Sequence, residues 1–334
     1  MNKTFTYRSP LATWIERYVA MKQSAGIRGL DAQWRLKELD DFAFESGYDK
    51  TFITEEFASG WRASRINDSA GTLYRKYSEI AQFSRFLCRN GQPSYIPIMP
   101  KTPAKDFIPY IFTRQQMSDI FKACDDKRME HKDMSSVLFV MPALLRMLYS
   151  TGLRVSEALS LTNADVNLED GIIMVRKTKN GKERMVPIRE SLSGVLKQYL
   201  HYRAKLPVAG ITAPSNLFFV KPNGSSMTTY SVYCQFKMIL LQCGIPHQGN
   251  HHGPRVHDLR HTAAVHSLAQ MSRAGLDTTT SLPVLSAFLG HQSLDATEKY
   301  VRLTAAMYPE IEERLSCAYP EIFPQTISCN EKRD

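Results

Sequence analysis

The chain of 334 residues is poor in cysteine, and the few cysteines it has are not paired. Its six cysteines are scattered along the sequence, and no two of them form a CxxC motif. Small secreted proteins that depend on disulfides carry cysteine at higher density and at regular spacing. The cysteine pattern therefore excludes a disulfide-stapled scaffold and predicts reduced, mostly buried thiols.

Long hydrophobic runs are also missing. The longest apolar stretch covers residues 137–149 and is interrupted by Pro142 and Arg146, whereas a helix needs about 20 apolar residues to cross a bilayer. The N-terminal segment MNKTFTYRSP contains no apolar core of a signal peptide. These absences predict a soluble, cytoplasmic protein without a membrane partner.

Acidic residues are outnumbered by basic ones. The chain has 33 Asp and Glu against 42 Lys and Arg, which gives a formal net charge of +9 and an isoelectric point near 9.2. A basic chain of this kind favours a polyanionic partner, most simply nucleic acid. Charge alone does not distinguish such a protein from an ordinary basic one, so the partner has to be identified from motifs.

Residues 1–95 are predicted to form a helical, DNA-binding domain. Apolar side chains recur at helical spacing from residue 10 to about residue 92, for example over residues 72–88. Residues 1–105 carry 16 basic and 11 acidic side chains, a net charge of +5. A basic helical surface can lie against DNA phosphates, and the same composition also fits a solvated face. The candidate DNA-binding residues here are Arg75, Lys76 and Arg85.

A proline-rich segment separates this domain from the next one. Residues 92–109 carry five prolines and show no helical period, which is typical of an extended linker. We place the linker at residues 96–111 and a catalytic domain at residues 112–306. Residues 307–334 form a C-terminal tail.

The second domain is predicted to be helical with one small sheet. The β-rich runs 171–176 and 184–188 flank Asn180-Gly181, the dipeptide typical of a type I′ hairpin turn. A further strand is predicted at residues 216–220. Helices are predicted at residues 113–124, 135–150, 153–161, 191–204, 229–242, 257–273, 282–289 and 295–307, and Gly152 is predicted to end the second of them. The fold class is mainly α with a small antiparallel β-sheet (α+β).

Two stretches early in this domain carry charged residues in apolar surroundings. The first, TGLRVSEAL, places Arg154 at the start of a helix and Glu157 one turn later. The second, KNGKER, is the predicted hairpin tip and begins at Lys179. Taken alone, Arg154 and Glu157 would be an ordinary salt bridge and Lys179 a solvated hairpin charge.

Two later stretches add histidine, arginine and tyrosine. In HDLRH, His257 and Arg260 share one helix face because they are three residues apart. In LGHQSLDATEKY, Tyr300 follows His291 by nine residues and lies in a predicted helix. Most tyrosines near a helix end pack their ring and solvate their hydroxyl. Tyr300 becomes a candidate functional residue only when it is considered together with the other three stretches.

This ordered set of motifs resembles the tyrosine recombinase (phage-type integrase) family, in particular its Xer and transposon-integrase branches. The family's catalytic domain carries TGLR followed by Glu, a hairpin lysine, HxLRH, LGH, and a tyrosine nine residues later. Each piece is present here in that order, over residues 112–305. The resemblance implies a two-domain DNA-breaking-rejoining enzyme fold with an N-terminal SAM-like helical bundle.

The resemblance and the positions of individual residues together suggest their roles. From its position, Glu157 is expected to support the site by orienting a neighbouring basic group, and Lys182 is the alternative to Lys179 as general acid. Lys182 and Arg184 are further candidates for DNA binding, whereas His261 is expected to be structural and to point away from Arg260. No cofactor or metal is implied. The catalytic residues would be Arg154, Lys179, His257, Arg260, His291 and Tyr300.

The chemistry of phosphodiester cleavage fits these residue types. Two guanidinium groups can bind the non-bridging oxygens and stabilise the extra charge of the transition state. A phenol with a pKa of about 10 needs a base or an electropositive site to become a nucleophile, and histidine suits proton transfer near neutral pH. The product would be a 3′-phosphotyrosine with a free 5′-hydroxyl, which another strand can reverse without ATP or metal.

A metal site is the main alternative reading of the histidines. His247, His251, His252, His257 and His261 lie close together in sequence, and the last two have the i, i+4 spacing of zinc helices. No HExxH motif and no cysteine pair completes such a site. Loss of activity on EDTA treatment would favour this reading.

Two other functions share the same features. A catalytically silent DNA-binding protein could keep the fold, but it would have no use for Tyr300. A type IB topoisomerase would use the same chemistry, and relaxation of supercoils without a specific site would favour it.

The resemblance further implies partners and a biological setting. The expected partner is double-stranded DNA, bound by a homotetramer on two recombination sites, with accessory DNA-bending proteins as further candidates. A nucleoid-associated enzyme of a mobile genetic element fits the transposon-integrase branch. The tail is acidic rather than basic, and the family commonly docks such a segment on the neighbouring subunit.

Overall fold

The computed structural model describes most of the chain, namely residues 5–27, 29–103, 108–127, 133–176, 178, 183–245, 253–291 and 293–308. The chain divides into two units, residues 1–107 and residues 108–334. Helices dominate both units, and the described strands form a small antiparallel sheet. No helix in these described ranges has both the length and the apolar character that a membrane crossing requires.

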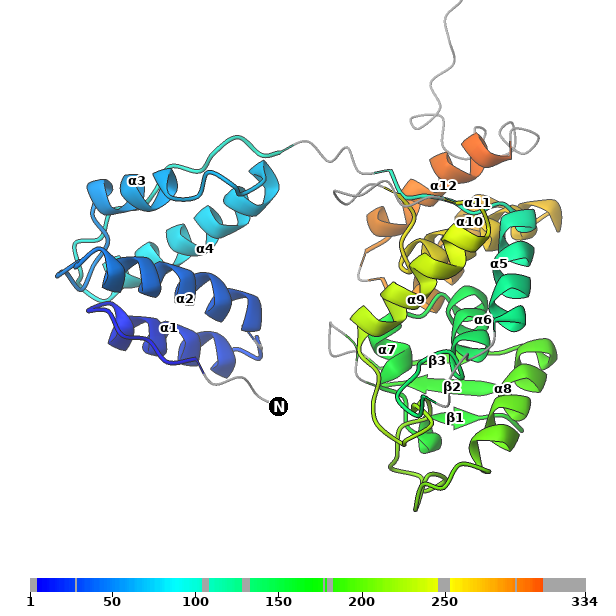
Figure 1. Ribbon diagram of the computed structural model, residues 1–334. Helices are drawn as coiled ribbons and strands as arrows, with labels where there is room; N and C mark the ends of the chain where they lie inside the picture. The colour runs from blue at the N-terminus through cyan, green and yellow to red at the C-terminus, as the bar shows by residue number, and fades with distance from the viewer. Residues whose placement is uncertain are drawn as a thin grey trace, which may run out of the picture. The chain divides into compact units, whose positions relative to one another are not determined.

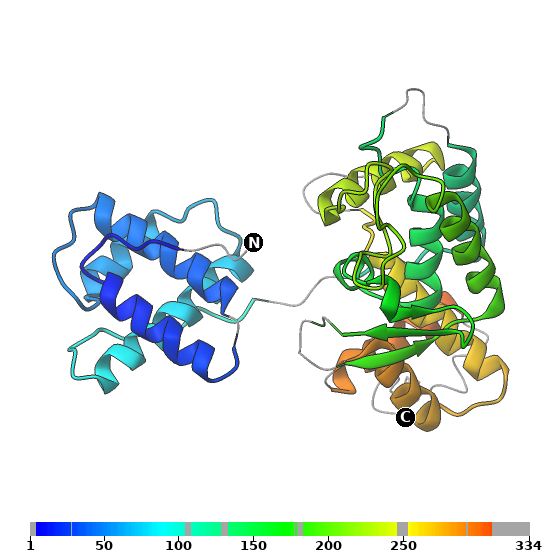
Figure 2. The same cartoon turned by 90° about the horizontal axis from the view of Figure 1, so that it is seen from below.

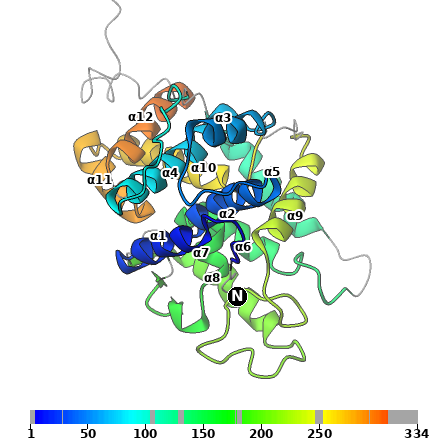
Figure 3. The ribbon, with the colours of Figure 1, turned by 90° about the vertical axis from the view of Figure 1, so that its left-hand side faces the viewer.

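The first unit has four helices within its described residues (Figure 1, Figure 3). They are α1 (Ala12–Ser24), α2 (Leu30–Glu45), α3 (Glu55–Ala63) and α4 (Ala70–Arg89). Helices α1, α2 and α4 contact one another, and α3 adds Phe57 and Trp61 to the same hydrophobic core. Side-chain hydroxyls cap the N-termini of two of these helices. The hydroxyl of Thr54 accepts from the N–H of Phe57 at the start of α3, and the hydroxyl of Ser69 accepts from the N–H of Thr72 at the start of α4.

Lys76 is a buried structural cation, which corrects the prediction that it contacts DNA. Its side chain is only 10% exposed, and its ammonium lies 2.6 Å from Glu38 and 2.9 Å from Asp68. The sequence placed Lys76 off the apolar face of its helix, but two acids from other segments hold it against the core. Arg75 and Arg85 of the same helix are exposed.

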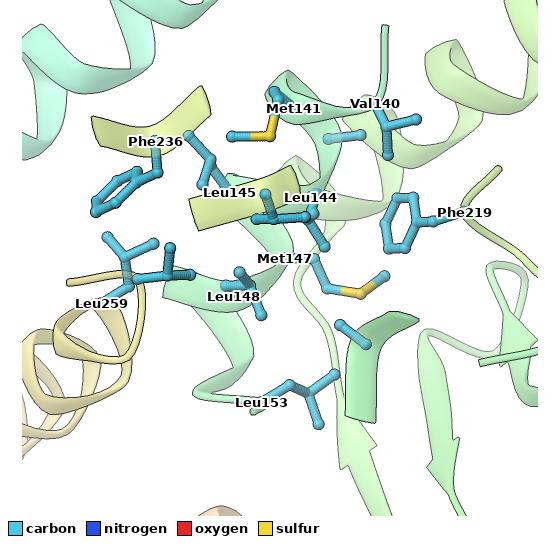
Figure 4. Close-up of a cluster of buried hydrophobic side chains, with 14 of the residues drawn as sticks. Val140, Met141, Leu144, Leu145, Met147, Leu148, Leu153, Phe219, Phe236 and Leu259 are labelled. Atoms are coloured by element: carbon cyan, nitrogen blue, oxygen red, sulfur yellow. The ribbon is translucent and has the colours of Figure 1, made fainter. Parts of the chain in front are cut away.

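The second unit is built around a buried helix. Its elements are α5 (Arg114–Asp126), α6 (Met141–Thr151), α7 (Val155–Leu159), η1 (Asn163–Asp165), α8 (Glu190–Arg203), α9 (Thr229–Gln242), α10 (Asp258–Arg273), α11 (Thr278–Leu289) and α12 (Asp295–Met307). Helix α6 contacts α5, α7, α8 and α10. Its Leu144, Leu145 and Leu148 are buried together with Phe236 of α9 and Leu259 of α10 (Figure 4). The apolar side chains of α6 require such cover.

Three strands complete the second unit: β1 (Val166–Asn167), β2 (Ile172–Val175) and β3 (Arg184–Pro187). They form an antiparallel sheet in the order β1-β2-β3, with Ile173 opposite Val186 and Val175 opposite Arg184. This pairing confirms the predicted hairpin, whose turn residues 180–181 lie outside the described residues. Strand β3 contacts α11, and Figure 2 shows the sheet beside the C-terminal helices.

Glycines in the left-handed conformation end the two helices that lead into the candidate site. Gly152 ends α6 with φ of +60°, as the sequence predicts, and Gly290 ends α11 with φ of +69°. Helix α10 contacts both α11 and α12. The core that these three helices share contains Val265, Leu285 and Val301.

Two helices begin several residues away from the predicted start, whereas the other predicted starts differ by two residues at most. Helix α6 starts at Met141 rather than at residue 135, because Pro142 occupies its first turn. Helix α11 starts at Thr278 rather than at residue 282, because the carboxylate of Asp277 accepts from the N–H of Thr280 and caps it.

The predicted strand at residues 216–220 is absent from the described structure. Leu217 forms only an isolated antiparallel bridge with Thr162. Phe218 donates its backbone N–H to the carbonyl of Leu161 at 2.8 Å, so this extended segment is anchored beside α7 without a ladder. Phe218, Phe219 and Val220 of this segment are buried, which explains the strand-like pattern.

Candidate active site

Arg154 stands at the N-terminus of α7 and is held by the carboxylate of Glu157, one turn later. Nη1 of Arg154 donates to Glu157 at 2.7 Å, and the backbone N–H of Arg154 donates to the same carboxylate at 3.0 Å. The Arg154 side chain is 26% exposed, whereas that of Glu157 is 2% exposed. The cation is therefore accessible from outside, and its counterion is not.

Arg260, on α10, is buried and bound to two helix ends. Its Nη1 donates to the carbonyl of Gly152 and its Nη2 to the carbonyl of Leu289, each at 2.7 Å. Carbonyls at helix C-termini lack partners within the helix, so Arg260 satisfies acceptors at the ends of α6 and α11. Burial, reinforced by the charge of Arg154, lowers the pKa of Arg260 to about 10, and the group remains a cation at neutral pH.

Tyr300, on α12, has no exposed surface and lies between histidines. Its hydroxyl is 2.9 Å from Nδ1 of His261, and its ring stacks on that of His291 with centroids 6.2 Å apart. Burial raises the pKa of Tyr300 to about 12, although the charges of Arg260 and Arg154 act in the opposite direction. The structure thus brings the phenol and both arginines within electrostatic reach of one another.

His261 was expected to be structural and to point elsewhere on the helix than Arg260, but it contacts the hydroxyl of Tyr300 and so reaches the candidate site. The sequence argument assumed that a residue next to Arg260 would leave the functional face of α10. Helices α6, α11 and α12 all contact α10, however, and residues on adjacent faces are covered together. Burial, with the charge of His257 next, lowers the pKa of His261 to about 3. Its imidazole is neutral at physiological pH.

His257 and His291 flank the same region. The ring of His257 meets that of His261 edge to face, with centroids 4.9 Å apart, and Nδ1 of His291 lies 2.7 Å from the hydroxyl of Thr297. Burial lowers the pKa of each to about 4, and the positive charges of Arg260 and Arg154 add to this effect. Both imidazoles are neutral at pH 7.

Of the hairpin candidates Lys179, Lys182 and Arg184, only Arg184 lies within the described residues. Lys179 and Lys182, the two candidates for general acid, lie outside the described residues. Arg184 was predicted to contact DNA, but its side chain is only 11% exposed and donates to Glu157 at 2.8 Å. This correction has a physical reason: a buried carboxylate in α7 attracts the guanidinium across from β3.

Lys299 is a further cation at this site that the motif analysis missed. Its Nζ lies 5.2 Å above the ring of Tyr300. Burial, and then the charge of Arg260, lowers the pKa of Lys299. Its position immediately before Tyr300 was the only signal in the sequence.

The histidines of the metal alternative are only partly described. His247, His251 and His252 lie outside the described residues. His257 and His261 pack against each other, and His261 is engaged by Tyr300. Within the described ranges no three His, Cys, Asp or Glu residues are grouped as metal ligands.

Comparison with known proteins identifies relatives of the whole chain. Residues 111–307 match the model of the phage integrase family. The tyrosine recombinase XerD of Pasteurella multocida is 29% identical over 308 residues, which cover 90% of this chain and 94% of that protein.

Solved structures show the same fold. The XerH site-specific recombinase, in a post-cleavage complex with its palindromic difH substrate, superposes with a TM-score of 0.63 and 21% identity, covering 90% of this chain and 83% of that one. The Tn1549 transposon integrase in complex with transposon right end DNA gives a TM-score of 0.61 and 16% identity, covering 88% and 94%. The predicted fold class is therefore confirmed.

Proposed function

The chain belongs to the phage integrase family, and we propose that it cuts and rejoins double-stranded DNA at specific sites through a covalent link to Tyr300. The observation that carries the proposal is the grouping of this phenol with Arg154, Arg260, His257 and His291 in one described region. A surface tyrosine would have no need of two arginines and flanking neutral histidines.

In the proposed reaction the phenolic oxygen attacks the scissile phosphorus. The bond from phosphorus to the 5′-oxygen breaks, a 3′-phosphotyrosine forms, and the 5′-hydroxyl leaves with a proton. Arg154 and Arg260 bind the non-bridging oxygens and stabilise the charge that develops on them. Attack of a second strand's 5′-hydroxyl on the phosphotyrosine runs the same step in reverse and restores the phenol.

Proton transfer is the second requirement of this reaction. The pKa of Tyr300 is raised to about 12, so the phenol is protonated in the resting enzyme and must lose its proton as it attacks. The neighbouring imidazoles are neutral and can accept hydrogen bonds. Lys179, with Lys182 as the alternative, would supply the proton to the departing 5′-oxygen.

Recombination of two DNA sites requires four strands to be cut, and one active site per strand implies a homotetramer. We expect the helical first unit to contact DNA phosphates, with exposed Arg75 and Arg85 as the candidates on α4. Accessory DNA-bending proteins, a nucleoid location and a role in a mobile element are further parts of this proposal. They rest on family resemblance alone.

The proposal is tested by incubating the protein with nicked duplexes selected from a randomised library for binding. A protein–DNA band that survives denaturation is expected for the wild type. Tyr300→Phe should bind the same duplex and give no band, whereas Tyr230→Phe, an exposed tyrosine on α9, should give the full band. Arg154→Ala should reduce cleavage more than binding.

Two results would contradict the proposal. A covalent band that persists in Tyr300→Phe would assign the link to another side chain. Relaxation of supercoiled plasmid regardless of sequence would instead identify a topoisomerase.

A further inference from the structure

A third guanidinium, that of Arg184, lies among the candidate catalytic groups. Arg184 is the first residue of β3, directly after the hairpin segment that carries Lys179 and Lys182. Its Nη2 donates to Glu157 at 2.8 Å, its Nη1 is 3.4 Å from the other carboxylate oxygen, and its Nε donates to the carbonyl of Phe288 at 3.3 Å. The hairpin is thereby tied to both α7 and α11.

Glu157 is shared between Arg184 and Arg154. Burial tends to raise the pKa of Glu157, but the hydrogen bonds and charges of these two arginines outweigh it, and the pKa is lowered. Arg184 approaches both carboxylate oxygens, and the side chain of Arg154 donates to one of them. With Arg184 across both oxygens, the guanidinium of Arg154 makes one hydrogen bond to Glu157 rather than the two that arginine and carboxylate favour.

Arg184 also borders the turn that holds Arg260 and His291. The carbonyl of Phe288 accepts from Arg184, and the next carbonyl, that of Leu289, accepts from Arg260. Gly290 follows, and a Cβ there would come within 3.0 Å of the Arg184 side chain. The guanidinium therefore lies against the turn that leads into His291.

We propose that Arg184 is a positioning residue for DNA cleavage. It holds Glu157 so that the guanidinium of Arg154 stays available to the scissile phosphate, and it fixes the hairpin to the α11 turn. This inference rests on the proposed function, since it concerns the orientation of the groups that would bind that phosphate.

The test compares Arg184→Gln with a matched control, Arg176→Gln. Arg176 follows β2 in the same hairpin, is exposed, and pairs with Asp165 at 2.8 Å rather than with Glu157. Single-turnover formation of the covalent product is measured on a phosphodiester and on a methylphosphonate, which has one neutral substituent at the scissile phosphorus. Binding of the same duplexes is measured in parallel.

Arg184→Gln is expected to slow cleavage of the phosphodiester by about 100-fold, the scale of losing one preorganised charge-stabilising group. Its affinity for DNA should stay within about twofold of the wild type, and the loss on the methylphosphonate should be about tenfold or less, because less charge needs stabilising. Arg176→Gln should behave as the wild type does on both substrates.

A second variant distinguishes the positioning role of Arg184 from a simple folding defect. Without Arg184, a buried Glu157 should capture Arg154, so Glu157→Gln added to Arg184→Gln should recover at least about tenfold of the lost rate. A merely structural role would give equal losses on both substrates and no recovery in the double variant, and this result would overturn the inference. A cleavage rate of Arg184→Gln equal to that of the wild type would also overturn the inference. If the wild type itself forms no covalent product on either substrate, the proposed function fails instead.

Discussion

At the scale of single residues, two opposing influences act on the pKa of the Tyr300 phenol. Burial stabilises its neutral form, and the nearby arginines stabilise its anion. The effect of burial is the larger one, so the phenol is protonated in the resting protein. In the proposed reaction the arginines would gain importance when charge grows on the phosphate and the phenolic proton is lost.

Buried histidines make the second unit sensitive to acid. The pKa of His261 is lowered to about 3 and that of His266 to about 4, in both cases mainly by burial. In the unfolded chain each has a pKa of about 6.5. The unfolded state therefore binds protons first, and stability that is complete above about pH 6.5 is lost as the pH falls toward about 4.

We expect each of these two histidines to contribute on the order of 2 kcal/mol of lost stability at about pH 5. Urea unfolding followed from about pH 7 to about pH 5 measures the loss. His266→Asn should flatten the decline, whereas His201→Asn, an exposed histidine on α8, should leave it unchanged. A stability that does not fall over this range would contradict the burial of both imidazoles.

The sequence predicted some residues of the site better than others, for physical reasons. Motif order pointed to Arg154, Arg260 and Tyr300, which the structure gathers. It could not show that His261 meets the Tyr300 hydroxyl, because that contact depends on how α12 packs on α10. Nor could it show Arg184 turning inward, since the attraction of a buried carboxylate from another element leaves no local pattern.

At the scale of elements, the C-terminal ends of α6 and α11 are held together by Arg260. Gly152 is the sensitive position, because its φ is +60° and a Cβ there would lie 2.6 Å from Leu289. We expect Gly152→Ala to lose roughly 1–2 kcal/mol from the backbone alone, with a further loss from this clash. Cleavage should also slow, since the Gly152 carbonyl accepts from Arg260.

Gly244→Ala is the control for this substitution. Its φ is +70°, and nothing lies within 4 Å of an added Cβ, so only the backbone part of the loss should appear. Thermal unfolding of the two variants separates the loss of stability that comes from the backbone from the loss that comes from the clash with Leu289. Equal destabilisation by both substitutions would show that the contact with Leu289 relaxes freely.

The sequence predicted element type more reliably than element limits. The β-hairpin was recognisable because two β-rich runs flank Asn180-Gly181, and the end of α6 was marked by Gly152. The start of α6 and the segment at residues 216–220 were not, because burial of irregular chain produces the same apolar pattern as a helix or strand. Strand β1 is too short to leave a periodic signal.

At the scale of the whole molecule, the acidic tail bears on assembly. Residues 308–334 carry six acidic and three basic side chains, which suits docking on a protein better than on DNA. If the tail docks on a neighbouring subunit, ending the chain after Tyr308 should preserve DNA binding and lower recombination by about 5- to 150-fold, the usual range of coupling between sites. Recombination assays on two-site plasmids, with gel-shift binding beside them, measure both. Unchanged recombination would leave the tail without this role.

The complete burial of Tyr300 has a kinetic consequence. In the proposed reaction, a Tyr300 hydroxyl with no accessible surface cannot touch a phosphate until the groups that cover it shift, so this uncovering step would set an upper limit on the rate of strand breakage that no excess of DNA can raise. Duplexes met in passing by a freely diffusing copy would therefore stay unnicked, since a brief encounter ends before the phenol is presented.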